Sequence, residues 1–134
     1  MKTLKKVATV LAVLLGLGFV LSTTSCGIAN VTIDEDFIAN EDFSSFVGTW
    51  VITIEEKNAN GESDNESGEV EFISAEVAKA YVQSIYTQSE VLKKYADSIG
   101  ESYEYSLATN LSRTVIVWKQ KAADYESTVT MKKK

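Results

Sequence analysis

The stretch SAEVAKAYVQSIYTQSEVLKKYADSI (residues 74–99) decides the fold, because its period differs from that of the segments on either side. Apolar residues recur in it at steps of three and four, the pattern of an amphipathic helix: Ala78, Val82, Ile85, Leu92, Ala96 and Ile99. Ser74 suits the N-cap and Gly100 suits a left-handed stop. The polar run 87–89 could divide the helix in two, with Ser89 capping the second part.

The segment before this helix has the period of two that is typical of strands. Residues 48–57 alternate apolar side chains (Trp50, Ile52 and Ile54) with more polar ones, and a shorter strand is expected over 69–73. Between them, residues 58–68 (NANGESDNESG) are rich in turn formers and acids, which favours a long hairpin loop.

Three further strands are expected after the helix, over residues 103–108, 114–121 and 125–132. The run Val115–Trp118 is apolar on both faces and therefore suits a central strand. The element order ββαβββ predicts an α+β fold. We expect a five-stranded, curved, mainly antiparallel sheet packed on one amphipathic helix.

The N-terminus reads as an export signal. Three lysines precede an apolar run over 7–21, which is too short to be read as a bilayer-spanning helix. The following stretch, Leu21–Cys26, resembles the lipobox of bacterial lipoproteins. The resemblance implies that Cys26, the only cysteine, is acylated and becomes the first residue after cleavage, although Thr23 departs from the usual aliphatic residue. The alternatives are an ordinary secretory signal followed by a free thiol, or an uncleaved anchor.

Composition limits the function. Without residues 1–25 the chain has 10 Lys and Arg against 19 Asp and Glu, a net charge of −9, which disfavours nucleic-acid binding. The chain has no histidine, so Ser–His and Cys–His catalysis and histidine–metal sites are excluded. Its paired carboxylates fall at exposed strand positions or in the loop. We therefore expect a protein that is not an enzyme and needs no cofactor.

The loop over 58–68 offers oxygen ligands at alternate positions, as a calcium loop does. An EF-hand would place glutamate six residues after Gly61, where this chain has Ser67. A hydrated acidic hairpin is therefore the preferred interpretation, and no metal site is predicted.

The segment Phe46-Val47-Gly48-Thr49-Trp50 resembles the Gly-x-Trp opening of lipocalin-like domains. The resemblance implies that Trp50 closes the floor of a barrel beneath an arginine, for which Arg113 is the one candidate. It also implies a shortened or partial barrel and a small hydrophobic ligand. The aromatic residues that could line such a pocket, or equally fill the core, are Trp50, Tyr103, Tyr105 and Trp118.

These observations divide the chain into a signal peptide (1–25), a lipidated acidic tether (26–42) and one α+β domain (43–134). Within the tether, 31–33 could be ordered, and 37–38 could dock onto the domain. We expect a lipoprotein of the cell envelope, on the periplasmic face of the outer membrane or the cell surface, with a membrane and an envelope protein as partners. The alternative is a carrier of a small hydrophobic molecule.

Overall fold

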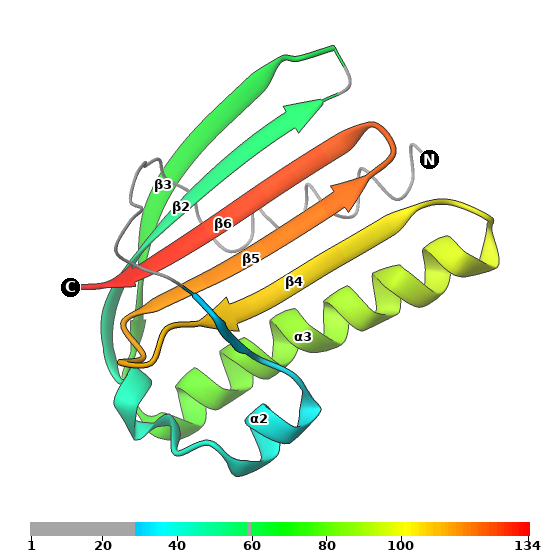
Figure 1. Cartoon of the computed structure of the whole chain (residues 1–134). Coiled ribbons are helices and arrows are strands. Elements are labelled where there is room, and N and C mark those ends of the chain that lie inside the picture. The colour runs from blue at the N-terminus through cyan, green and yellow to red at the C-terminus, as the bar shows by residue number, and fades with distance from the viewer. Residues whose placement is uncertain (1–28, 59) are drawn as a thin grey trace.

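A computed structural model describes residues 29–58 and 60–134. Within this part the chain forms an antiparallel sheet against a long helix, with two short helices at one end (Figure 1). The elements are β1 (Val31–Thr32), α2 (Glu35–Asn40), the 3₁₀ helix η2 (Phe43–Phe46), β2 (Gly48–Asn58), β3 (Ser63–Phe72), α3 (Ala75–Ser98), β4 (Tyr103–Thr109), β5 (Val115–Ala122) and β6 (Tyr125–Lys133). The predicted α+β class and the packing of a sheet on one long helix are confirmed.

The sheet has six strands in the order β1-β4-β5-β6-β2-β3. The last strand in the sequence, β6, lies inside the sheet between β5 and β2, where Lys133 pairs with Trp50. The outer strands β1 and β3 do not pair with each other, so the sheet is curved but not closed (Figure 1). The predicted number of five strands was wrong, because β1 has only two residues and carries no readable period.

Helix α3 forms where the apolar stripe predicts it. The Ser74 hydroxyl caps the first turn by accepting a hydrogen bond from the Val77 amide (3.2 Å). At the other end Gly100 has φ +72°, and the Glu101 amide donates to the Ala96 carbonyl (2.8 Å). The helix is continuous through residues 87–89, so the polar run does not divide it.

The core lies between α3, the two short helices and one face of the sheet. Trp50, Ile52 and Ile54 of β2 are all buried on this face, and so is Trp118 of β5. The other buried members of the cluster are Ile33, Ile38, Phe43, Phe46, Phe72, Ala78, Val82, Ile85, Leu107, Ile116, Val129 and Met131.

The hairpin before α3 is longer than predicted. We expected a loop over 58–68, but β2 continues to Asn58 and β3 begins at Ser63. The Asn58 amide donates to the Glu62 carbonyl (3.0 Å), and Gly61 turns the chain with φ +83°. The backbone ladder pairs Glu55 with Asn65, and it forms whatever the polarity of the side chains.

Much of the expected tether packs against the domain. Val31 pairs with Thr109 at the start of β1, and Ile33 and Ile38 are buried. The Asp34 carboxylate caps α2 by accepting from the Phe37 amide (2.9 Å). The signal segment and Cys26 lie outside the described residues. No helix in the described part is long and apolar enough to cross a bilayer.

Candidate functional site

The described helices all lie on one side of the sheet. Residues of α2, η2 and α3 share a single buried cluster with alternate residues of β2, β4, β5 and β6. Because side chains alternate across a strand, the intervening residues point to the opposite side. No described helix covers this second face, which we call the open face (Figure 1).

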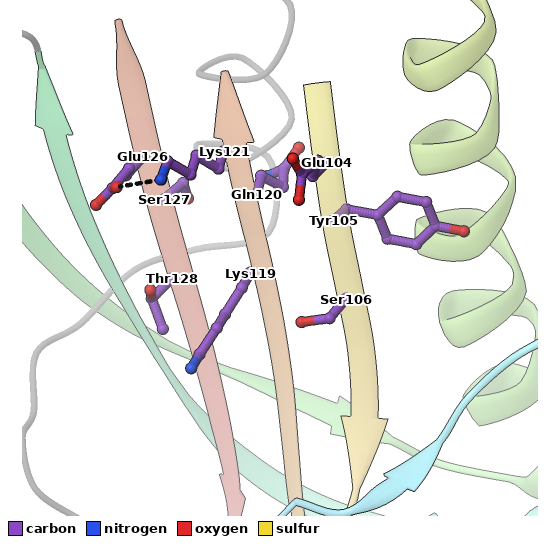
Figure 2. Close-up of a pocket in the computed structure, with 9 residues that line it drawn as sticks. All are labelled: Glu104, Tyr105, Ser106, Lys119, Gln120, Lys121, Glu126, Ser127 and Thr128. Carbon is purple, nitrogen blue, oxygen red and sulfur yellow. Dashed lines mark ion pairs between the residues drawn. The ribbon is translucent and has the colours of Figure 1, made fainter. Parts of the chain in front are cut away.

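The open face carries a shallow groove of ≈ 380 Å³ over β4, β5 and β6 (Figure 2). It is lined by Glu104, Tyr105, Ser106, Lys119, Gln120, Lys121, Glu126, Ser127 and Thr128. By register, Glu104, Ser106, Lys119, Lys121, Glu126 and Thr128 are open-face residues. In Figure 2 the Tyr105 ring instead points toward the helix.

Charged residues of opposite sign alternate across one row of the groove. Lys121 lies opposite Glu104 of β4 on one side and Glu126 of β6 on the other. The Lys121 Nζ is 3.9 Å from the Glu126 carboxylate, and both side chains are more than half exposed. An exposed ion pair of this kind contributes little free energy to stability, so a binding partner can break it and contact both side chains.

The next row of the groove combines one lysine with two hydroxyl residues. Lys119 lies between the hydroxyl residues Ser106 of β4 and Thr128 of β6 in the strand register. The two rows together offer ammonium donors, hydroxyl groups and carboxylate acceptors on a rigid sheet. No aromatic residue occupies an open-face position of β4, β5 or β6. This surface suits recognition of a polar partner by hydrogen bonds and ion pairs.

The aromatic residues predicted as ligand contacts lie on the helix side. Trp50 is fully buried, and its Nε1 donates to the Phe46 carbonyl (2.8 Å), which fixes η2 on the sheet. The expected contact between Arg113 and Trp50 is not made. Arg113 instead lies over the ring of Phe37, 5.1 Å from its centroid.

Trp118 is also a core residue. Its indole N–H is bonded by Ser89, which the sequence did not indicate as a partner. Its Nε1 donates to the Ser89 hydroxyl (2.9 Å), and Ser89 donates to the Ile85 carbonyl (2.9 Å). Ser89 is fully buried. The only sequence signal for this contact is a serine within the apolar stripe of the helix.

Tyr103 is buried beside the other end of α3. Its hydroxyl donates to the Gln120 Oε1 (2.7 Å), and burial raises the pKa of Tyr103 well above its usual range. The Gln120 Nε2 and the Ser127 hydroxyl, which face each other in the register of β5 and β6, are buried without a hydrogen-bond partner in the described part of the chain.

Tyr105 is partly exposed at the border between the sheet and α3. Its hydroxyl donates to the Glu90 carboxylate, and burial, followed by this hydrogen bond and then by the Glu90 charge, raises the pKa of Tyr105. It also lines a second groove of ≈ 450 Å³ between α3 and β1, together with Tyr86 and Glu90. Of the four predicted aromatic residues, Tyr105 is thus the one that a ligand could reach.

The acidic hairpin is held by its own hydrogen bonds. The Asn58 Oδ1 accepts from the amides of Asn60 (2.9 Å) and Glu62 (3.1 Å), while the Asn58 Nδ2 donates to Glu62 Oε1 (2.7 Å). The side-chain oxygens of Asn58 and Glu62, two of the groups that stand at alternate positions of this hairpin, are therefore engaged in the turn. Among the described residues, no group of three or more acidic, cysteine or histidine side chains is arranged to hold a metal ion.

Comparison with known proteins identified no relative of this chain. No protein-family model, curated protein or solved structure matches this chain. The candidate site therefore rests on the geometry of the open face alone.

Sequence reasoning did not identify the groove. Lys119 and Lys121 alternate with buried residues along β5, so their outward position could have been read from the sequence. Their neighbours could not, because Glu104, Glu126 and Thr128 come beside them only through the strand register.

Proposed function

We propose that this chain is a membrane-anchored, non-enzymatic lipoprotein of the cell envelope that acts as a binding module. The observation that carries the binding role is the open face, where a rigid sheet presents a charged groove on the side opposite the described helices. The anchor rests on the lipobox-like stretch that ends at Cys26.

The position of β1 limits the distance between the proposed anchor and the sheet. Only residues 27–30 separate Cys26 from Val31, the first residue of β1. A chain reaches about 3.5 Å per residue when fully extended, so this spacer spans less than about 20 Å. An acylated Cys26 would therefore hold the β1 edge of the sheet close to the membrane surface.

The first experiment tests the anchor. Intact-mass measurement of the membrane-extracted protein should show a chain that begins at Cys26 and carries acyl mass, and the Cys26→Ala variant should stay unprocessed. A wild-type chain cut without added lipid would overturn the anchor. The protein would then be released.

The second experiment tests the groove. A photo-crosslinking residue at Lys119, on the open face, should give a discrete adduct in intact cells. The same residue at Lys93, on the exposed side of α3, is the matched control. Equal adducts at both positions, or none at Lys119, would contradict a binding role for the groove.

The alternative of a lipocalin-like carrier depends on the resemblance of Gly48-x-Trp50. The start of β2 at Gly48 and the curvature of the sheet agree with it. The unclosed sheet and the burial of Trp50 and Trp118 do not favour it. A fluorescent lipid probe distinguishes the two functions, because saturable, stoichiometric binding would favour the carrier.

A further inference from the structure

The two edges of the sheet differ in length and protection. At one edge, β1 has two residues. At the other, β3 has ten residues in unbroken one-to-one register with β2, and no described strand pairs with its outer side. Edge strands are commonly protected by proline, bulges, shortness or charged side chains. Strand β3 has no proline, bulge or lysine, and its charged side chains are the four acids Asp64, Glu66, Glu69 and Glu71.

The hydrogen-bond pattern shows which groups of β3 point outward. The Asn58 amide donates to the Glu62 carbonyl (3.0 Å), and the Lys134 amide donates to the Thr49 carbonyl (2.9 Å). Antiparallel pairs alternate between bonded and non-bonded positions, so even-numbered residues of β2 turn to β3 and odd-numbered residues turn to β6. The N–H and C=O groups directed away from β2 are thus those of Ser63, Asn65, Ser67, Glu69 and Glu71.

All charged side chains along this edge are acidic. Asp64 and Glu66 lie on the helix side, and Glu69 and Glu71 on the open face, all exposed. Among the described ion pairs only Lys134 reaches β3, at 2.7 Å from Glu69. On the helix side, burial raises the pKa of Glu56, and the charges of Asp64 and Glu66 add to this rise, whereas the Tyr125 hydrogen bond opposes it.

We propose that the outer edge of β3 binds an extended, lysine- or arginine-rich protein segment that pairs with it as a seventh strand. The unpaired backbone supplies the docking site, and the acidic side chains on both faces select a basic partner. The same charges repel a second copy of this chain, which would place acids opposite acids. The proposal rests on the role as a binding module, but it uses a surface separate from the groove.

The test uses the full chain in neutral detergent and a fluorescein-labelled ten-residue peptide that alternates lysine with threonine. Fluorescence anisotropy should show saturable binding that weakens with salt. The same peptide with glutamate in place of lysine should not bind. Hydrogen exchange should show new protection of amides within 63–72 and no change in 115–122.

Two changes separate strand pairing from general charge attraction. Ser67→Pro removes an outward N–H without touching the ladder to β2, a position where edge strands tolerate proline, and should weaken binding about tenfold. Ser67→Ala is the matched control and should bind as the wild type does. Methylation of alternate backbone nitrogens in the peptide should weaken binding similarly, with the protein unchanged.

Any of three binding results would overturn the proposal, in addition to self-association through β3: no saturable binding at millimolar peptide, equal binding of the glutamate peptide, or unchanged binding after both backbone changes. Sedimentation that shows self-association through β3 would also overturn it. If the peptide fails while the Lys119 crosslink and the Cys26 acylation hold, the proposed binding module stands and only the β3 site is lost.

Discussion

Arg113 and Glu41, which are 72 positions apart in the sequence, form a two-pronged ion pair that ties the end of α2 to the turn between β4 and β5. The Arg113 Nε donates to Glu41 Oε2 (2.8 Å), and Nη2 donates to Oε1 (3.1 Å). Both side chains are at most one-fifth exposed, and Arg113 has φ +59°. The Glu41 carboxylate raises the pKa of Arg113.

Arg113→Ala should lower the free energy of unfolding by about 2 kcal/mol, since it leaves Glu41 partly buried without its partner. Urea titration followed by tryptophan fluorescence measures this loss. Lys121→Ala breaks an exposed pair of 3.9 Å and should change the free energy by less than about 0.5 kcal/mol. Equal losses would contradict a structural role for the Arg113 pair.

Ser89→Ala should destabilise the fold by about 1–3 kcal/mol, because it leaves the buried Trp118 N–H without an acceptor. Ser84→Ala, at an exposed position of the same helix, is the matched control. In the double variant with Trp118→Phe, the loss should be smaller than the sum of the two single losses. Additive losses would mean that the hydrogen bond contributes little.

Gly48→Ala should cost about 1–3 kcal/mol from backbone strain alone, because Gly48 has φ +139°. A Cβ there would also lie 2.9 Å from Cε of Lys133, whose ammonium donates to the Ser45 carbonyl (3.0 Å). Gly61→Ala is the control, since Gly61 has φ +83° but no atom near the added methyl group. The shift in melting temperature should be larger for Gly48→Ala, where both the backbone conformation and the contact with Lys133 oppose the methyl group. Equal shifts for the two variants would contradict this expectation.

Glu56→Gln should make the domain more stable at neutral pH. The pKa of Glu56 is raised above its ordinary value of 4.5, first by burial, and also by Asp64 and Glu66, against the opposing hydrogen bond from Tyr125 (2.8 Å). The folded state therefore holds a proton that the unfolded state loses, so stability falls as the pH rises above about 4.5 toward the folded pKa.

The gain from Glu56→Gln should appear at pH 7 and disappear near pH 4, where the carboxyl is protonated in both states. Urea unfolding at the two pH values measures it. Glu104→Gln, at an exposed site of β4, controls for the lost surface charge. A gain from Glu56→Gln that is equal at both pH values would contradict the linkage.

The parts of the fold that follow from local periodicity were predicted well. The helix expected over 74–99 is observed as Ala75–Ser98, and the strand expected over 125–132 is observed as Tyr125–Lys133. The alternative in which the helix divides at Ser89 is not observed, because this polar side chain is satisfied inside the core by Ile85 and Trp118.

The parts that depend on distant pairing could not be predicted. The first half of β3 has no apolar alternation, since α3 does not bury its side chains, and only its backbone ladder to β2 makes it a strand. Strand β1 exists because Val31 meets Thr109. The groove has the same origin, since Glu104 and Glu126 reach Lys121 only through the register.

The place of β6 inside the sheet sets the order in which the molecule can be assembled. Within the sheet, only β6 pairs with both described hairpins, β2 and β3 on one side and β4 and β5 on the other, although α3 also packs against both through the core. The two hairpins therefore cannot form one continuous sheet until β6 lies between them. Loss of β6 would therefore divide the sheet into two separate parts, whereas loss of β1 or β3 would only shorten it at an edge.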